Sequence, residues 1–508
     1  MAVPITEQTK DIPDSISLKY LVDHIVKNLN KTYVILILAI SLYGIYTIAL
    51  TPNLFSGGDN AHYLVLADAL QSGQGYKTIS QISAPFATER PPGFPMMLAP
   101  IIYGKNLDIL AIKRITAIWG PMAILAVYYY FKQKTNASYA LGIAFLFAIM
   151  PIVFMYTRRI YASMPFTTIT FLAFIFIHTY AQKKHWLNGH LILSSLLITI
   201  AFYLRTIGFV LLISAVLWLL IRKQFAKAIS LTVLCTPLMA FWFYWTSQVQ
   251  QTVRSGYLSQ LFQTGGVLPQ IQLGISNLVG NMRLIAENIF YLSSKVPQQL
   301  HLTTPIFAFI SYLAIIIVLI FIIVGFLNSK IISLPNIYLF LYVSILFIWP
   351  HVINRFIIPI LPFMIHYYIQ GITRLSRWLY QRFNISKKLA YLLFIGLIFE
   401  IVLSGLVHIP ARLYQEQQFH NYNAEIAAFY DVAGWAGQNL SQDAVVSTQD
   451  NNFFYIYSLR RQTVPVEVDG ILPIETNYFI APSQDISSTA KTLYCAAISD
   501  VCIFEFTE

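Results

Sequence analysis

Long apolar stretches recur along almost the whole chain, and they restrict it to one fold class. About eleven of them approach the length that crosses a bilayer, near residues 33–50, 109–131, 137–156, 164–181, 190–204, 206–221, 228–246, 303–327, 333–349, 356–372 and 389–408. Of the 508 residues, 57% are hydrophobic and 11% are charged, which is more apolar surface than water-soluble cores can bury. The sequence predicts a polytopic α-helical membrane protein with about 11 transmembrane helices and excludes a soluble enzyme.

The basic residues predict how these spans are oriented. The net charge is +11, but in such a chain cations are first topology determinants, so basicity does not indicate a nucleic-acid partner. Alternate connections and the N-terminal segment carry the lysines, which predicts that they are cytoplasmic. We expect a multi-pass protein of the plasma (inner) membrane, with a cytoplasmic N-terminal segment (1–32) that holds an interfacial helix, and an extracytoplasmic C-terminus. The first apolar run lacks a small-residue cleavage site and is expected to stay attached.

The connections that face outward are long. Within the membrane domain (33–408) they are a first outer loop (51–108) and a second outer loop (247–302). The second has helix-length apolar periodicity broken by glycines and a proline, which predicts amphipathic helices on the membrane surface. The segment 409–508 alternates a helix from Ala424 to about Leu440 with short apolar strands, so we expect a small extracytoplasmic α/β domain. Its Cys495 and Cys502 could form a disulfide in an oxidising compartment.

The first outer loop begins with SGGDNAHY, where Asp59 follows a double glycine at the membrane exit of the first span. A carboxylate half-buried beside lipid can have its protonation tuned for general-base catalysis, with His62 and Tyr63 close by to contact a substrate. Alternatively, Asp59 caps the N-terminus of the helix that contains these two residues. Spacing alone favours the cap.

The same loop ends with ERPPGFP. Two successive prolines fix the direction of the backbone before them, and with it the side chains of Glu89 and Arg90. An arginine held rigidly at the membrane surface can bind a phosphate through two donors. It can equally extend to lipid headgroups, and the sequence does not separate these two interpretations.

Arginines also gather in the short outward connections, which contain no lysine. This opposes the usual bias toward cytoplasmic cations, so an anion is expected to compensate them, and a lipid phosphate would do so. The four residues are Arg158, Arg159, Arg205 and Arg355.

Other polar residues in apolar stretches are expected to be structural. Glu400 lies in the middle of a span without a basic residue in reach, and His178 and His366 are interpreted as hydrogen-bonded packing residues. The chain has no Walker A, GxGxxG, HExxH or GxSxG motif, so nucleotide-driven transport, zinc proteolysis and serine hydrolysis lack support. A reaction on the outer face would therefore need a pre-activated donor.

Four pieces of the sequence together resemble the polyprenyl-phosphate-sugar-dependent membrane glycosyltransferases of the C-type fold, the superfamily of the aminoarabinose transferase of lipid A and the protein O-mannosyltransferases. They are GGDNAHY, ERPPGFP, AFYLRTIGFVLL and NRFIIPILPF before a soluble tail. The resemblance implies that Asp59 is the catalytic base and that Arg90 contacts the lipid phosphate. Met164 stands where the family often has a second acid, which leaves Glu89 as the nearest substitute. No cofactor is certain, and the resemblance leaves a divalent metal open.

The resulting expectation is a glycosyltransferase that moves a sugar from a polyprenyl phosphate to a hydroxyl of a lipid, glycan or protein acceptor on the outer face. Displacement by a single base predicts inversion at the anomeric carbon. Two alternatives remain. A transporter or flippase of a lipid-linked sugar should show paired broken helices and midplane charges, which the sequence lacks. A catalytically inactive relative that only binds lipid phosphate is favoured by the missing second acid.

Overall fold

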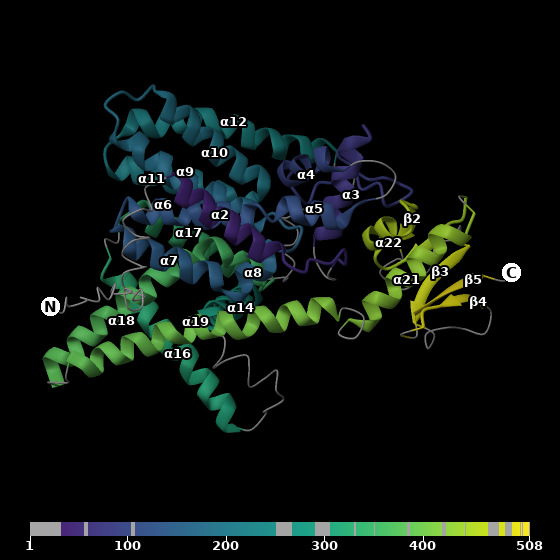
Figure 1. Cartoon of the computed structure of the whole chain (residues 1–508). Coiled ribbons are helices and arrows are strands. Elements are labelled where there is room, and N and C mark those ends of the chain that lie inside the picture. Colours follow the sequence, from purple (N-terminus) through teal and green to yellow (C-terminus); the bar gives the residue numbers. More distant parts are fainter. Residues whose placement is uncertain are drawn as a thin grey trace, which may run out of the picture.

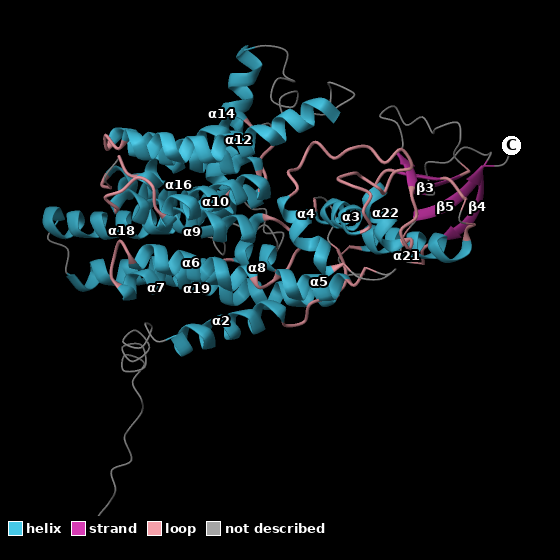
Figure 2. Ribbon diagram, turned by 90° about the horizontal axis from the view of Figure 1, so that it is seen from above, coloured by secondary structure: helices cyan, strands magenta, loops and turns pink. Residues whose placement is uncertain are grey.

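The computed structural model describes residues 32–54, 59–102, 107–249, 267–289, 305–329, 332–349, 351–383, 387–418, 423–441, 443–465, 477–482, 490–497, 499 and 501–506. Most long helices run side by side, and a small β-sheet lies at one end of them (Figure 1). The helices α3, α4, α21 and α22 gather at this same end in both views (Figures 1 and 2). The first outer loop and the C-terminal segment therefore meet at one end of the helical body.

The helices of the body follow the apolar stretches of the sequence. Their bounds are α2 (Thr32–Thr47), α3 (Asn60–Gln71), α4 (Gly93–Leu98), η1 (Ala99–Ile101), α5 (Ile109–Thr116), α6 (Trp119–Lys132), α7 (Ala137–Ile149), α8 (Pro151–Thr157), α9 (Ser163–Gln182), α10 (Gly189–Leu204), η2 (Thr206–Gly208), α11 (Phe209–Ile221), α12 (Phe225–Val249), α14 (Val267–Ile289), α16 (Pro305–Leu327), α17 (Leu334–Ile348), η3 (Asn354–Phe356), η4 (Ile358–Ile360), α18 (Leu361–Phe383) and α19 (Lys387–Gln417).

Several of these helices have the length and composition of membrane spans. Within the described residues, six helical segments are both long enough and apolar enough to cross a membrane: Ile109–Lys132, Ser163–Gln182, Phe225–Val249, Phe309–Leu327, Asn354–Arg382 and Ile395–Gln417. The pair α7 and α8 is a further candidate, and four apolar helices are shorter: Leu36–Thr47, Gly189–Leu204, Thr206–Ile221 and Leu334–Ile348. The structure thus has several apolar helices, as a multi-pass protein requires. It does not confirm the count of about 11, and the orientation of the termini stays a prediction.

Two boundaries differ from the sequence-based expectation. The stretch 137–156 is not one straight span, because α7 and α8 meet at an angle of 67°. Pro151 is the first residue of α8, where its missing N–H breaks the helical hydrogen-bond pattern. In contrast, α19 continues past the expected boundary at residue 408 to Gln417 and accommodates Pro410. The apolar stretches of the sequence therefore do not by themselves determine where these helices begin and end.

Part of the second outer loop is helical, as its periodicity predicts. The described helix is α14, which packs against α16 and α17. On the side that faces α17, Asn277 donates from Nδ2 to the carbonyl of Trp349, the C-cap residue of α17, over 2.6 Å. Ile271, Ile275 and Val279, spaced four residues apart, remain exposed on the other side. The interfacial helix expected within residues 1–32 lies outside the described residues apart from Thr32, the first residue of α2.

The C-terminal segment forms the small α/β unit. Its elements are α21 (Ala424–Asn439), β1 (Val446–Thr448), α22 (Asn451–Tyr457), β2 (Thr463–Pro465), β3 (Tyr478–Pro482), β4 (Ala490–Cys495) and β5 (Val501–Phe506). The sheet order is β2-β1-β3-β5-β4, with parallel pairs β1–β2 and β1–β3 and antiparallel pairs β3–β5 and β4–β5. Alanines of α21 pack with Val446 and Ile503 in one buried cluster, because small side chains let the helix approach the sheet. Asp450 caps α22 by accepting from the amide of Phe453.

The first outer loop completes this unit at its edge. The amide of Thr463 donates to the carbonyl of Ser80 over 2.9 Å, and the amide of Ile82 donates to the carbonyl of Thr463 over 3.0 Å. The loop thereby pairs with strand β2, which would otherwise present unpaired backbone groups. Nearby, Asp68 of α3 accepts from Tyr455 Oη and from Arg460 Nε, both over 2.9 Å. These contacts join the C-terminal unit to the loop that contains Asp59.

A disulfide links β4 and β5. Cys495 and Cys502 face each other directly in the register of the two strands and are bonded. Disulfides persist in oxidising compartments, so the extracytoplasmic position expected for this segment predicts that the bond also forms in cells.

We expect this bond in the protein from intact cells. In a Cys235→Ser variant only the Cys495–Cys502 pair remains, and thiol alkylation followed by mass spectrometry should find both cysteines protected until a reductant is added. Alkylation of both thiols without reduction would contradict an oxidising location for this domain.

Candidate functional site

Asp59 lies at the start of α3, but its side chain does not cap that helix. The residue occupies the N-cap position, and its carboxylate makes no hydrogen bond to the amides of the first turn. Only its backbone carbonyl takes part in the helix, by accepting from the amide of Tyr63 over 2.7 Å. The capping interpretation, which spacing alone favours, is therefore wrong for the carboxylate.

Two arginines from distant parts of the chain hold the Asp59 carboxylate. Arg90 Nη2 lies 2.7 Å from Oδ1, and Arg355 Nη1 lies 2.6 Å from Oδ2. All three side chains are largely buried, with 13% of Asp59, 21% of Arg90 and 14% of Arg355 exposed. Charge-assisted bonds of this kind are short and strong. The sequence predicted each residue as a site residue, and the structure brings the three together.

The backbone around Arg90 is fixed by its neighbours. Tyr76 Oη donates to the carbonyl of Arg90 over 2.9 Å. Three residues later, Gly93 begins α4 against the end of α10, where a Cβ atom would lie 2.5 Å from the carbonyl oxygen of Tyr203. Only glycine allows this approach, because a backbone atom cannot move aside as a flexible side chain can. The PPG turn therefore seats Arg90 beside the end of α10.

Arg205 follows α10 at that point and supports Arg355. Its Nη1 donates to the carbonyl of Arg355 over 3.3 Å, and its guanidinium lies 4.6 Å from the ring centre of Phe356. Arg355 itself belongs to the short turn η3, with its guanidinium 5.3 Å from the ring centre of Tyr161. Cations over aromatic faces are stabilised by the ring quadrupole. Arg205 thus positions Arg355 and does not pair with Asp59.

The arginines determine the protonation of Asp59. Burial alone would raise the pKa of its carboxyl group, but the charges of Arg90 and Arg355, and their hydrogen bonds, lower this pKa below its ordinary value of 3.8. Asp59 is therefore ionised in this arrangement. It is also a weak proton acceptor, since protonation would break ion pairs.

His62 is a neutral donor in the same site. Its Nδ1 lies 2.6 Å from Arg90 Nη1, and because a guanidinium can only donate, Nδ1 must accept and the ring proton must lie on Nε2. Burial, together with the charge of Arg90, lowers the pKa of His62 to about 3. The Nε2 atom is buried and has no hydrogen-bond partner among the described residues.

Further predicted residues surround this core. Tyr63 is buried, packs edge-on against Phe94 with ring centres 4.9 Å apart, and interacts electrostatically with Asp59 and the arginines at 90, 205 and 355. Glu89 is about half exposed and binds Arg90 Nη1 over 3.2 Å. Arg159 lies over the ring of Tyr156, and Tyr156 also interacts electrostatically with Asp59. Tyr76 and Tyr161 were not predicted, since tyrosines are frequent throughout the sequence.

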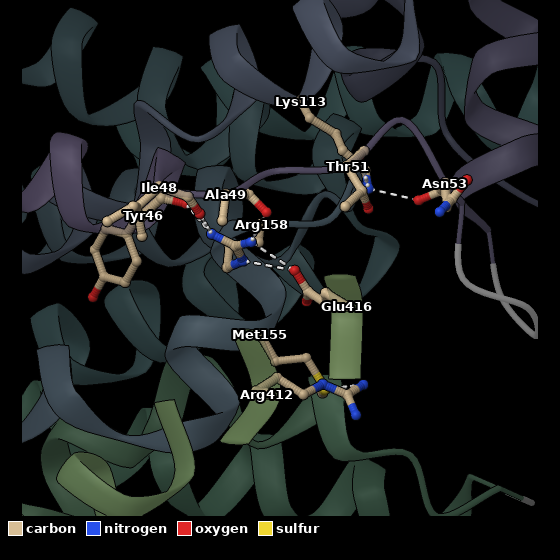
Figure 3. A network of polar contacts seen from close by, with 10 residues as sticks. All are labelled: Tyr46, Ile48, Ala49, Thr51, Asn53, Lys113, Met155, Arg158, Arg412 and Glu416. Carbon is tan, nitrogen blue, oxygen red and sulfur yellow. Dashed lines mark hydrogen bonds and ion pairs between the residues drawn. The ribbon is translucent and has the colours of Figure 1, made fainter. Parts of the chain in front are cut away.

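Arg158 corrects the prediction of a phosphate-binding residue. Its Nε and Nη2 donate to Oε2 of Glu416 over 3.0 and 2.6 Å, its Nη1 to the carbonyls of Tyr46 and Ile48 over 2.9 and 2.6 Å, and its Nη2 to that of Ala49 over 3.2 Å. These bonds use all five donors of a fully buried guanidinium (Figure 3). Arg158 is therefore a structural residue that joins α2, α8 and α19, and no local sequence pattern indicates Glu416 as its partner.

The described residues around Asp59 do not fit a divalent metal. No group of three or more His, Cys, Asp and Glu side chains converges within the part of the chain that the structure describes. Both oxygens of Asp59 face guanidinium groups, and Met164, where a second acid was expected, is buried at the start of α9. Mg²⁺ and Ca²⁺ require several oxygen ligands, so no chemical step is assigned to a metal here.

Other histidines in the apolar helices have the structural partners that we expected. His366 Nδ1 lies 3.0 Å from Tyr139 Oη. His178 Nε2 lies 3.0 Å from Gln182 Nε2, and its ring stacks on Trp218.

Comparisons with known proteins agree with this fold. The model of the family described as dolichyl-phosphate-mannose-protein mannosyltransferase matches residues 89–246. No curated protein sequence matches the chain. The structure of ArnT from Cupriavidus metallidurans bound to undecaprenyl phosphate is 11% identical, with 93% of this chain and 98% of that chain covered and a TM-score of 0.59.

Two archaeal structures are also similar. The Archaeoglobus fulgidus oligosaccharyltransferase tethered with an acceptor peptide is 12% identical, with 89% of this chain and 70% of that chain covered and a TM-score of 0.51. AglB from the same organism, in complex with an inhibitory peptide and a dolichol-phosphate, is 12% identical, with 89% of this chain and 70% of that chain covered and a TM-score of 0.52. The chain thus shares the fold of these structures, as the resemblance inferred from the sequence implies.

Proposed function

We propose that this protein is a membrane glycosyltransferase that moves a sugar from a polyprenyl phosphate donor to a hydroxyl group of a lipid, glycan or protein acceptor at the outer face of the membrane. The observation that carries the proposal is the cluster of one ionised carboxylate and two arginines, Asp59, Arg90 and Arg355, at the end of the helical body where the disulfide-bonded domain lies. Structures of similar fold hold undecaprenyl phosphate and dolichol-phosphate.

The cluster supplies the two groups that such a reaction needs. A carboxylate can accept the proton of the acceptor hydroxyl, which contributes typically 10²- to 10⁴-fold to a rate. Two positioned guanidinium groups can stabilise the charge that grows on the departing phosphate. Asp59 is the base, Arg90 and Arg355 bind the phosphate, and His62 Nε2 is a further donor toward it. Since the described residues place no second carboxylate as a nucleophile, the proposed reaction is a direct displacement that inverts the anomeric carbon.

The proposal predicts that phosphate binding and transfer both depend on Arg90. Membranes that contain the wild-type protein should transfer label from a pool of radiolabelled polyprenyl phosphate sugars to a membrane acceptor. We expect Arg90→Ala to lower that transfer by about 10²- to 10³-fold, as for the removal of one positioned donor to a developing anion. Arg377→Ala is the control, because Arg377 is an exposed arginine of α18 that donates to the carbonyl of Thr373 in its own helix.

Equal transfer by Arg90→Ala and wild type would exclude Arg90 from the reaction. Absence of transfer by the wild type from every donor in the pool would contradict the glycosyltransferase function itself.

A further inference from the structure

The carboxylate proposed as the base is fully engaged in ion pairs. Arg90 occupies Oδ1 at 2.7 Å and Arg355 occupies Oδ2 at 2.6 Å. The same two arginines are the groups proposed to bind the donor phosphate. A guanidinium fork matches carboxylate and phosphate equally well, so the two anions must compete for it.

We propose that the phosphate of the incoming donor draws Arg90 and Arg355 away from Asp59, so that Asp59 becomes an effective base only while the donor is bound. This inference rests on the proposed function and adds to it the regulation of the same site.

The charges of the cluster fit this exchange. Two arginines and one aspartate carry +2 and −1, which leaves +1 for a sugar phosphodiester of charge −1. In the transfer step the acceptor oxygen bonds to the anomeric carbon, and the bond from that carbon to the phosphate oxygen breaks. The electron pair of the broken bond stays on the polyprenyl phosphate, whose charge becomes −2, while the hydroxyl proton neutralises Asp59. The total charge of cluster and phosphate is therefore zero before and after the step.

The surroundings of Asp59 supply a place for the phosphate. The protonated Nε2 of His62, three residues from Asp59, is buried without an acceptor among the described residues. A buried donor without a partner is destabilising, and a phosphate oxygen would satisfy it. Other titratable groups that interact electrostatically with Asp59 are Tyr63 on α3, Tyr156 on α8 and Tyr161 after α8. Two further charged groups contact the arginines of the cluster: Glu89 binds Arg90, and Arg205 donates to the carbonyl of Arg355.

The inference makes an unusual prediction about affinity. Purified full-length Asp59→Asn should bind undecaprenyl phosphate about tenfold more tightly than the wild type, since the anion that competes for both arginines is gone. Glu89→Gln is the matched control. Glu89 also binds Arg90, but it is about half exposed and its ion pair is screened by solvent, so the change in affinity should be much smaller.

The arms of the experiment separate the possible causes. All variants should bind undecaprenol, which lacks the phosphate, with the affinity of the wild type. If Asp59→Asn also bound undecaprenol more tightly than the wild type does, the inference would be overturned. Inorganic phosphate should bind far more weakly than the lipid, and equal affinity would overturn the assignment to a lipid phosphate. If Asp59→Asn unfolds at a lower temperature than the wild type and cannot be purified, Asp59→Ser serves in its place.

Failure of the inference and failure of the proposed function give different results. Suppose that Arg90→Ala and Arg355→Ala no longer bind undecaprenyl phosphate, while the Asp59 variant binds it no more tightly than the wild type. The site then binds phosphate, but Asp59 does not compete with the phosphate for the two arginines. If the two arginine variants bind like the wild type, the phosphate site itself is wrong.

Discussion

Asp59→Asn should lower the rate of sugar transfer by about 10²- to 10⁴-fold although the protein still binds the lipid phosphate. Asparagine keeps the size and hydrogen-bonding oxygen of the side chain but cannot accept the proton of the acceptor hydroxyl, and this is the range over which general-base catalysis contributes. The measurement is transfer of radiolabelled sugar at matched amounts of protein in the membrane.

Asp108→Asn is the control in the same outer loop. Asp108 is exposed and caps α5 by accepting from the amide of Ala111 over 2.9 Å, a role that asparagine can keep. We expect wild-type transfer from this variant. Equal transfer by the Asp59 variant would mean that Asp59 is only part of an ion-pair network and not the base.

The pH dependence of the wild type follows from the same contacts. Since Arg90 and Arg355 hold the pKa of Asp59 below the ordinary value of a carboxyl group in the free protein, the acid limb of kcat/KM due to Asp59 should lie at a lower pH than an ordinary aspartate would give. If the donor phosphate then takes the arginines, the pKa of Asp59 in the complex rises. The acid limb of kcat should consequently lie at higher pH than that of kcat/KM, and coincident limbs would argue against the exchange of partners.

Breaking the buried pair of Arg158 and Glu416 should have the largest effect on stability. The side chains are 0% and 3% exposed with 2.6 Å between Arg158 Nη2 and Glu416 Oε2, so removal of one partner leaves a charge that water cannot reach. Such single removals cost about 3–5 kcal/mol. We expect Glu416→Gln to lower the free energy of unfolding by about this amount, measured by denaturant or detergent titration of the purified protein.

Arg158→Met should be at least as harmful, because the carbonyls of Tyr46, Ile48 and Ala49 lose their donor as well. Lys491→Gln is the control. The pair of Lys491 and Glu505 is 3.9 Å apart, with exposed fractions of 66% and 36%, and should contribute nothing measurable. A stability of Glu416→Gln equal to that of the wild type would show that the pair does not hold α19 against the first span.

The role of Arg158 shows where the sequence misleads. Arg158 and Arg159 are adjacent and have the same expected role. Arg158 donates to Glu416 and to three carbonyls, while Arg159 lies over the ring of Tyr156, which also interacts electrostatically with Asp59. Nothing local distinguishes them. The difference arises from Glu416, 258 residues away, which the packing of α19 brings to Arg158.

The case of Asp59 is similar. A residue after a double glycine and before a helical segment has every local feature of an N-cap, and Asp59 does stand at that position. Its carboxylate turns to Arg90 and Arg355 because two full charges attract it more strongly than backbone amides do. These contacts depend on the fold, which brings Arg90, 31 positions from Asp59, and Arg355, nearly 300 positions from it, to the same carboxylate.

The sequence by itself determined the class of the protein, the approximate positions of its apolar helices, the α/β character of its last hundred residues and the two motifs of the first outer loop. These properties follow from local hydrophobicity, periodicity and turn residues, which act within one or two turns of chain. Only the tertiary structure decided which arginines meet Asp59, which one is structural, and how the first loop completes the edge of the C-terminal sheet. Those contacts join residues far apart in the chain, and long-range packing is not encoded in any local pattern.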